Sequence, residues 1–442
     1  MAKVIKLRKG LDINLKGKAA LETTSVKCPG EYALVPDDFT GVKPKVVVKE
    51  GDNVLIGDAL FVDKLHPEVK FVSPVSGTVS MVERGDRRKL LSIRVKSDGK
   101  QSARTFDTKQ DIKALLLESG MFAFLRQRPY DVVANPEDKP KAIFVSAFNS
   151  MPLSQDFEYV LKGEEKAFQA GITALSKLAK VHLGVSARQT SAALTGATGC
   201  EVTVFDGPAP AGNVGVQINH VDPINKGEVV WTLGAEEVLF IGRLLTTGRV
   251  DLTRTVALAG SEVKKPCYAK MLVGQRLDTL LQGQVDLSAG IRIINGNVMT
   301  GVKTTAGGYL GAHVTEVNVI PEGDHADEFM GWIMPRFGTF STHRSYFSWL
   351  CGKKDYVFDA RVKGGERHMI MSGEYDKVVP MDIYAGYLIK AIITGDIDRQ
   401  EALGIYEVAP EDFAIAEFVD SSKLELQRIV RQGLDILRKE NA

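Results

Sequence analysis

Residues 141–260 alternate between short apolar runs and helical stripes, and this alternation restricts the fold more than any other feature of the sequence. The apolar runs have the length of buried strands and lie at 141–148, 181–186, 201–207 and 255–260. The helical stripes lie at 163–180 and 235–248. The second stripe ends at Gly248, a residue type common at helix C-termini. Strand–helix repetition of this kind predicts a parallel sheet covered by helices.

The first 100 residues and residues 261–325 carry mainly strand patterns. In the first region, Gly-Asp, Ser-Gly and Arg-Gly-Asp turns interrupt short β-branched runs, which predicts a compact all-β module. In the second we expect a strand, a turn at Gly274, a short helix and then a hairpin. The hairpin is indicated by the Asn-Gly and Gly-Asn pairs in GIRIINGNVMTG, residues 290–301. Residues 261–325 therefore form a small α+β unit.

The C-terminal part, from about residue 376, has helical patterns. Ser422 and Glu425 have the spacing of a capping box, which predicts a helix start at this point. One face of the helix that follows is apolar and consists of Leu426, Ile429, Val430, Leu434 and Leu437. We expect this face to be buried.

Charge, apolar runs and cysteines exclude several classes of protein. The formal net charge is +1, so no global field attracts nucleic acid or an acidic membrane. No apolar run reaches the roughly 18 residues of a membrane span, and the basic start MAKVIKLRKG lacks the apolar run of a signal peptide. The cysteines form no C-x-x-C pair, so we expect free, buried thiols at Cys28, Cys200, Cys267 and Cys351.

Lys64 is a candidate for covalent modification. The segment VKEGDNVLIGDALFVDK and the later SPVSGTVS resemble the biotinyl/lipoyl carrier fold over about residues 45–95, and Lys64 occupies the place of the modified lysine. Gly77 follows Lys64 by thirteen residues, with Pro67 between them, a longer spacing than in lipoate carriers. Methionines do not flank Lys64. We therefore predict an unmodified lysine on a structural barrel.

A second candidate is the loop in FDGPAPAGNVGVQINHVDPI, residues 205–224. It follows a predicted strand but matches neither G-x-G-x-x-G nor the P-loop pattern, and the next strong helix signal begins near residue 234. We interpret it as a conformationally restricted loop at the carboxyl end of a sheet strand, with nucleotide binding as the alternative. Weak ligand-binding candidates are Gly207, Gly212, His220 and Asp222, although a lone histidine is more often structural.

Two further segments carry chemistry-bearing side chains. Residues 329–350 combine many aromatic residues with Arg336, His343 and Arg344, a composition that protein interfaces enrich. This segment either binds a partner or ligand or packs on the main body. Residues 322–328, EGDHADE, contain Asp324, His325, Asp327 and Glu328. We interpret this run as a solvated turn and not as a metal site, and no catalytic triad is legible.

Three segments together resemble one known family. LRKGLDINLKGKA, DKLHPEVKFVSPVSGTVS and GPAPAGNVGVQINHVDP are similar to the NqrA family, the A subunits of the sodium-translocating NADH:quinone reductase, over nearly the whole chain. More distant relatives are the C subunit of the Rnf complex and the flavin-bearing subunit of complex I. The resemblance implies a biotinyl/lipoyl-like β barrel, a Rossmann-like parallel α/β domain, a β-grasp soluble-ligand-binding-like domain, an aromatic-rich connecting segment and a helical C-terminal region, at 1–100, 101–260, 261–325, 326–375 and 376–442.

The resemblance also implies a function that belongs to an assembly. The complex couples NADH oxidation and quinone reduction to outward Na⁺ transport, using flavins and iron centres. This chain lacks both the C-x-x-C-x-x-C clusters of the Rnf subunit and the glycine-rich flavin loop of the complex I subunit. We therefore expect a peripheral subunit on the cytoplasmic face of the membrane, without its own redox cofactor and inactive when isolated. Its partners would be the membrane-embedded subunits and quinone, but not nucleic acid.

Two alternatives remain open from the sequence. The chain could be a carrier protein modified on Lys64, or a soluble oxidoreductase that uses a flavin or nucleotide. The first would carry a covalent arm, and the second would oxidise NADH alone.

Overall fold

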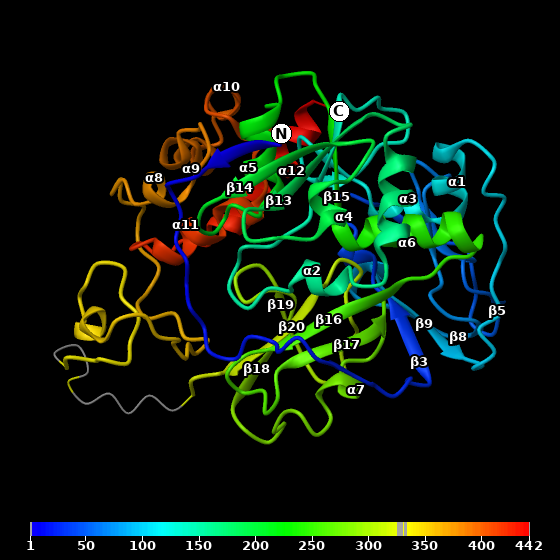
Figure 1. Ribbon diagram of the computed structural model, residues 1–442, viewed down its shortest axis with the longest axis horizontal. Coiled ribbons are helices and arrows are strands. Elements are labelled where there is room, and N and C mark those ends of the chain that lie inside the picture. Colours follow the sequence, from blue (N-terminus) through cyan, green and yellow to red (C-terminus); the bar gives the residue numbers. More distant parts are fainter. Residues whose placement is uncertain (1, 325–329, 331–333, 442) are drawn as a thin grey trace.

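The computed structural model describes residues 2–324, 330 and 334–441. In these residues the strands form a seven-stranded, a six-stranded, a four-stranded and a three-stranded sheet. Figure 1 shows the seven-stranded sheet with its helices above the six-stranded sheet, and the first β module to one side. The N-terminal 34 residues join all of these parts, because β1 (Lys3–Lys6), β2 (Thr23–Thr24) and β3 (Glu31–Leu34) enter three different sheets.

The seven-stranded sheet confirms the predicted parallel arrangement. Its order is β1-β14-β13-β12-β15-β10-β11, and the first five strands run parallel to one another. The other strands are β10 (Arg126–Arg128), β11 (Val132–Val133), β12 (Ala142–Ser146), β13 (Lys180–Ser186), β14 (Glu201–Asp206) and β15 (Val230–Gly234). The sequence pattern did not reveal that β1 forms its edge, because KVIK is too short to be assigned to a distant sheet.

Helices cover this sheet as predicted. They are α2 (Phe157–Val160), α3 (Glu165–Leu175), α4 (Ala192–Thr195), α5 (Val214–Val221) and α6 (Ala235–Thr247). Helices α3 and α6 pack closely, and glycines make this possible. A Cβ on Gly171 would lie 2.3 Å from the Val238 carbonyl oxygen, and one on Gly242 would lie 1.8 Å from the Ala167 carbonyl oxygen. Larger residues at either glycine would force the two helices apart.

The strand expected at 255–260 exists, but the prediction that it closes the parallel sheet is wrong. It is β16 (Thr253–Ala259), and it lies in the six-stranded sheet of order β19-β18-β20-β16-β17-β2. There it pairs antiparallel with β17 (Cys267–Leu272). A short apolar run fits the interior of either sheet, so its pattern could not decide between them.

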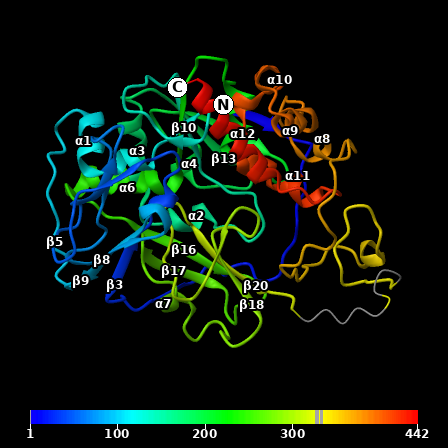
Figure 2. The ribbon, with the colours of Figure 1, turned by 180° about the vertical axis from the view of Figure 1, so that it is seen from behind.

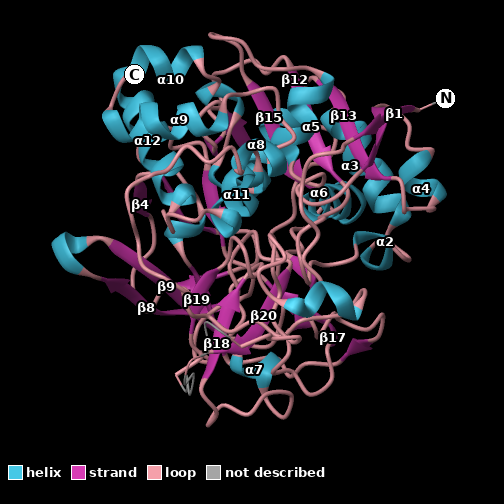
Figure 3. Cartoon of the chain, turned by 90° about the vertical axis from the view of Figure 1, so that its left-hand side faces the viewer, coloured by secondary structure: helices cyan, strands magenta, loops and turns pink. Residues whose placement is uncertain are grey.

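The local elements predicted for residues 261–325 are confirmed. Gly274 has φ +76°, and the short helix α7 (Asp278–Leu281) follows it. Strands β18 (Ile291–Asn295) and β19 (Val302–Thr304) form the expected hairpin, and β20 (Glu316–Pro321) lies beside β18. Figure 3 shows this sheet below the helices of the C-terminal part.

The first β module consists of two small sheets, of order β3-β9-β8-β5 and β4-β6-β7. Its further strands are β4 (Pro44–Val46), β5 (Asn53–Val54), β6 (Ala59–Asp63), β7 (Lys70–Val72), β8 (Gly77–Arg84) and β9 (Leu90–Ser97). Phe61 and Phe71, which face each other on the paired strands β6 and β7, stack with ring centroids 4.4 Å apart, and Phe39 contacts Phe71 edge-on at 4.6 Å. Helix α1 (Ile112–Ser119) follows, with Gly120 as its C-cap.

The C-terminal part is helical, as predicted. It contains α8 (Tyr375–Val378), α9 (Ala385–Thr394), α10 (Ile397–Ala402), α11 (Ala414–Val419) and α12 (Leu426–Glu440). Figure 2 shows α12 lying across the molecule beside α9 and α11. Short 3-10 helices are η1 (Pro36–Asp38), η2 (Asp86–Arg88), η3 (Met121–Phe124), η4 (Phe347–Cys351), η5 (Ile405–Glu407) and η6 (Pro410–Phe413).

The predicted capping box at Ser422 and Glu425 is wrong. Helix α12 starts at Leu426, and no side chain caps it. Ser422 is buried, and its Oγ donates to the His368 carbonyl oxygen at 3.1 Å and accepts from the Ile370 amide at 3.2 Å. The Ser422 hydroxyl therefore bonds to the segment 368–370 and does not cap helix α12.

The cysteine prediction is correct in part. All four are free, and Cys267 is buried, but Cys28 and Cys351 are exposed. Across the described residues, helix length and hydropathy reveal no candidate for a membrane span.

Helix α12 provides a direct test of the packing. Leu434 is fully buried, whereas Ile436 on the same helix is 46% exposed. We expect Leu434→Ala to lower the free energy of unfolding by about 2–5 kcal/mol because it leaves a cavity. Ile436→Ala, the control, should change it by less than about 0.5 kcal/mol. Urea denaturation followed by circular dichroism measures both, and equal effects would contradict the buried face.

Candidate functional site

A cavity of about 250 Å³ lies at the carboxyl edge of the seven-stranded sheet. Strands β12 and β15 end there at Ser146 and Gly234, and open α/β sheets bind ligands at this edge. The walls also come from α5, α6, the six-stranded sheet and η6, and include Phe148, Gln155, Asn213, Thr300, His313 and Glu411. The site therefore lies where three parts of the chain meet.

The loop predicted from the sequence forms one wall, but the element after it differs from the prediction. Helix α5 begins at Val214, directly after the loop, whereas the sequence pattern suggested no helix before residue 234. A Cβ on Gly212 would lie 2.6 Å from the Ser150 amide and 2.9 Å from the Phe148 carbonyl oxygen. Gly212 is thus required by the close approach of two loops at the cavity wall.

The other loop candidates do not join Gly212 at the cavity. Gly207 packs on Leu7, whose Cβ would lie 2.7 Å from an added Cβ. His220 lies near the end of α5, and its Nδ1 is 2.9 Å from the Val216 carbonyl oxygen. Asp222 follows the helix and pairs with Lys141 at 2.7 Å. Helix α5 thus carries both polar residues to the opposite edge of the sheet from Gly212.

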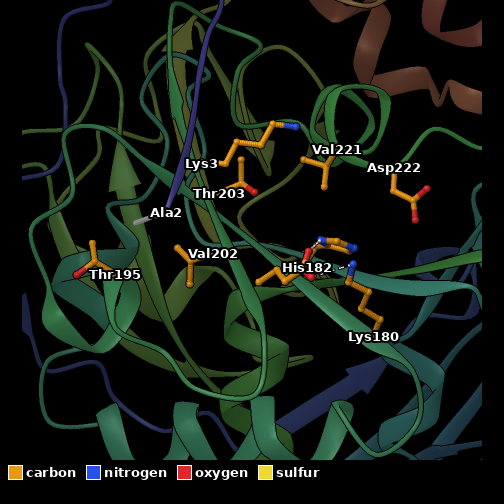
Figure 4. A pocket seen from close by; sticks show the side chains of 10 residues that line it. Ala2, Lys3, Lys180, His182, Thr195, Val202, Thr203, Val221 and Asp222 are labelled. Carbon is orange, nitrogen blue, oxygen red and sulfur yellow. Dashed lines mark ion pairs between the residues drawn. The ribbon is translucent and has the colours of Figure 1, made fainter.

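Asp222 instead lines a second hollow, at the amino edge of the sheet, with a volume of about 700 Å³ (Figure 4). His182 is buried in its wall and stacks on Phe144 at 4.7 Å. Burial, together with Lys180, lowers the pKa of His182. Lys180 pairs with Glu201 at 2.9 Å. Lys180, Glu201 and Asp222 are thus paired within the fold, whereas neither ring nitrogen of the buried His182 has a hydrogen-bond partner among the described residues.

A buried ion cluster forms one side of the 250 Å³ cavity. Arg254 of β16 is fully buried and pairs with Glu236 at 2.9 Å and with Glu237, both in the first turn of α6. Its Nε also donates to the Ala312 carbonyl oxygen at 3.1 Å. The guanidinium therefore joins the helix of one sheet to a strand of the other.

The two glutamates respond differently to this cation. Burial opposes ionisation of Glu237, but Arg254 and His313 outweigh it, so the pKa of Glu237 falls to about 2. Burial raises the pKa of Glu236 above its ordinary value despite Arg254. Glu236 also accepts from the Thr255 amide at 3.1 Å. Glu237 is thus a fixed anion, and Glu236 holds its proton more readily.

A third carboxylate, Glu411, reaches the cavity from η6. Burial and the neighbouring Asp412 raise the pKa of Glu411 to about 7, although Arg128 opposes this. Arg128 is buried and pairs with Glu411 at 3.1 Å and with Asp412 at 3.2 Å. The cluster fixes the C-terminal helices to β10, the strand that carries Arg128.

The charge of the cavity limits what it can bind. A helix N-terminus normally favours phosphate, but at α6 the first turn carries Glu236 and Glu237. Glu237 is an anion, so a phosphate at this turn would lie beside a carboxylate group as well as the helix amides. Apolar side chains at Phe148, Met151 and Phe157 line the remaining wall. The arrangement suits a neutral, partly apolar ligand with hydrogen-bonding groups.

Lys64 lies exposed in the connection between β6 and β7, where an enzyme could reach it. Of the acidic run at 322–328, Asp324 is described, whereas His325, Asp327 and Glu328 lie outside the described residues. No cluster of three or more His, Cys, Asp or Glu side chains that could hold a metal occurs within the described part of the chain.

Comparison with known proteins assigns the parts of the chain. Residues 5–98 match the NqrA N-terminal barrel-sandwich hybrid domain, 107–250 the NqrA second alpha/beta domain and 255–306 the NQRA C-terminal domain, of SLBB type. The A subunit of the Na(+)-translocating NADH-quinone reductase of Yersinia pestis (strain Angola) is 35% identical over 99% of this chain and 100% of its own length. The corresponding subunit of Rhodopirellula baltica is 34% identical over 99% and 98%, and that of Haemophilus influenzae (strain PittGG) is 36% identical over 99% and 100%.

The chain belongs to the NqrA family. It is a mixed α/β multidomain member with a barrel-sandwich domain, an SLBB domain and C-terminal helices. The NAD⁺-reducing [NiFe]-hydrogenase in the H₂-reduced state is similar at a TM-score of 0.36 and 13% identity, covering 69% of this chain and 55% of that one, a likeness that supports no argument.

In terms of the NqrA domains, the ion cluster lies at a junction. Glu236 and Glu237 belong to the second alpha/beta domain, and Arg254 immediately precedes the SLBB domain. No sequence motif marks the cluster. The only available signal was the consecutive acidic pair at the start of a predicted helix.

The cluster predicts a large effect for one substitution. Arg254→Met should lower the free energy of unfolding by about 3–5 kcal/mol, because it leaves buried carboxylates without their cation. Adding Glu237→Gln to Arg254→Met should recover part of the loss. The control is Arg399→Met, since the Arg399 side chain is 78% exposed and its pair with Asp396 should contribute less than about 1 kcal/mol. If Arg254→Met behaves like the control in urea denaturation, the junction does not depend on this cluster.

Proposed function

We propose that this chain is the peripheral NqrA subunit of a Na⁺-translocating NADH-quinone reductase on the cytoplasmic face of the membrane. The observation that supports this is similarity to named NqrA subunits over 99% of the chain. The assembled enzyme couples NADH oxidation and quinone reduction to outward Na⁺ transport. Its membrane-embedded subunits are the partners of this chain.

Within that assembly the domains have more specific types. The all-β module is of biotinyl/lipoyl-like type, the second domain is Rossmann-like and the SLBB domain is a β-grasp. The helical region starts near residue 376, after the connecting segment 326–375. The boundary near 260 shifts to about 252, because β16 begins at Thr253 and pairs only with strands of the six-stranded sheet. Strand β1 belongs with the Rossmann-like domain for the same reason.

The chain holds no flavin or other redox cofactor of its own, and the electron carriers belong to its partners. The charge of the cavity supports this: Glu236 and Glu237 stand at the helix N-terminus where a flavin or dinucleotide phosphate would bind. The ionised Glu237 carboxylate makes this position unfavourable for a phosphate. Lys64 remains unmodified and the barrel is structural.

The same cavity binds the ring of a quinone. Its apolar walls suit a neutral ring, and the Thr232 hydroxyl can donate to a quinone carbonyl oxygen. The side-chain amides of Gln155 and Asn213 already donate to acceptors within the fold. At about 250 Å³ it is smaller than most drug-sized ligand pockets, so it takes the head group while a long tail extends outward.

Purification from native membranes tests the assembly. The tagged chain should co-purify with membrane-embedded subunits and with flavin absorbance, whereas the chain expressed alone should be colourless. Its intact mass should equal that of the unmodified polypeptide. A stoichiometric flavin or iron–sulfur spectrum from the solitary chain would contradict the proposal, as would an added mass on Lys64. NADH oxidation by the chain alone would favour the soluble oxidoreductase.

The cavity gives a separate prediction. Thr300 lines it yet is exposed, so Thr300→Trp should block the opening without disturbing the core. We expect the Kd for a short-chain quinone, measured by calorimetry, to rise on the order of tenfold, or about 1.4 kcal/mol. Thr305→Trp, at an exposed threonine outside the cavity, is the control. Binding of flavin mononucleotide in place of quinone, or no difference between the variants, would place the quinone elsewhere.

A further inference from the structure

Residues 334–354, here called the tip segment, project from the body between β20 and α8 (Figures 1 and 2). Its base is fixed. Phe340 packs on Phe418 of α11 with ring centroids 5.9 Å apart. Just beyond the segment, the Tyr356 amide donates to the Asn14 carbonyl oxygen at 2.9 Å. The sequence allowed two interpretations of this segment, packing on the main body or binding a partner or ligand. Packing on the body explains the base of the tip segment but not the remainder of it.

The remainder of the tip segment exposes large apolar side chains. Trp349 is 49% exposed and Leu350 is 60% exposed. Met334, Phe337 and Phe347 are exposed to a similar degree. A soluble domain rarely leaves so many large apolar side chains on one short segment unless another surface covers them. Trp332, a further aromatic residue of the predicted interface, lies outside the described residues.

The tip segment is also basic. It contains Arg336, Arg344, Lys353 and Lys354 and no aspartate or glutamate. The whole chain has a net charge of only +1, so the rest of the chain is net acidic. The overall charge therefore averages out a basic stretch, which Asp355 and the acidic run 322–328 border in the sequence. The prediction that no global field attracts an acidic membrane concerns the chain as a whole.

Cations and rings are paired within the tip segment. The Arg344 guanidinium lies over the Trp349 ring, 5.2 Å from its centroid, and the Arg336 guanidinium lies 5.5 Å from the centroid of Tyr346. Each such pair holds a cation directly beside an apolar ring. This combination is typical of segments that lie in the interface of a bilayer, with rings at the acyl boundary and cations at the phosphates.

We propose that the tip segment binds an anionic lipid surface, with Phe347, Trp349 and Leu350 inserted at the acyl boundary and the basic side chains at the lipid phosphates. This inference rests on the proposed place of the chain in a membrane enzyme. Lipid is favoured over a protein partner by charge. Cytoplasmic loops of membrane proteins carry an excess of Lys and Arg and would repel this segment, whereas the anionic lipids of the cytoplasmic leaflet attract it.

Vesicle flotation with the purified full chain tests the proposal. The wild type should bind vesicles of phosphatidylcholine mixed with phosphatidylglycerol, bind pure phosphatidylcholine weakly, and be released by salt. Phe347→Ala with Trp349→Ala should reduce binding by on the order of tenfold, because two rings no longer insert. Lys353→Gln with Lys354→Gln should reduce it similarly and weaken the salt dependence.

Matched control variants distinguish binding through the tip segment from non-specific binding to vesicles. Tyr384 and Tyr387 on α9 are 68% and 61% exposed, so Tyr384→Ala with Tyr387→Ala removes exposed rings elsewhere. Arg87→Gln with Arg88→Gln removes a basic pair from η2. Both controls should bind vesicles like the wild type. Circular dichroism melting curves should be unchanged in all four variants.

Three results would overturn the proposal. The wild type could fail to bind anionic vesicles, or the controls could lose as much binding as the tip variants. The tip variants could also keep vesicle binding but lose co-purification with membrane subunits, which would assign the segment to a protein partner. Co-purification of the wild type is measured independently, so failure of vesicle binding alone leaves the proposed subunit function intact.

Discussion

The arrangement of the domains depends on one buried cation. Arg254 is fully enclosed and reaches from β16 of the six-stranded sheet to Glu236 and Glu237 on α6. A guanidinium without water needs every donor satisfied, and here two carboxylates and the Ala312 carbonyl oxygen accept from it. Since these acceptors belong to different parts of the fold, satisfying them sets how the two sheets meet. The cavity at the sheet edge follows from that junction.

The junction also decides the chemistry of the cavity. In a parallel α/β sheet, the amides of a helix N-terminus at the carboxyl edge usually stabilise an anionic ligand. In this chain Glu236 and Glu237 occupy that helix turn because they are needed for Arg254. The helix turn that could bind a phosphate is therefore occupied by the two side chains that pair with Arg254. This supports the proposal that the chain leaves electron carriers to its partners.

The sequence predicted the local elements well and their distant partners poorly. The parallel strands, the β18–β19 hairpin and the apolar face of α12 follow from periodicity, which is a local property. The sheet of β16 and the edge position of β1 depend on contacts with remote residues, and α5 lacks the capping and strong stripe that announce a helix. Of the site, the pattern identified Gly212 but not Glu236, Glu237 or Arg254. The ion cluster joins residues that are ordinary in sequence and become distinctive only when buried together.

The buried domain junction and the exposed tip segment differ in how their charges are placed. Acidic groups are concentrated where the domains meet, and there they are buried and matched to Arg254 and Arg128. Arg344 and Lys353 of the tip segment are exposed at the surface, and Arg344 lies over an exposed ring. A net charge of +1 is an average over the buried clusters and this surface and hides the difference between them. Charges matched inside the fold contribute little field outside it, whereas exposed cations contribute to the potential that a neighbouring molecule meets. The tip segment is therefore basic although the chain as a whole is almost neutral.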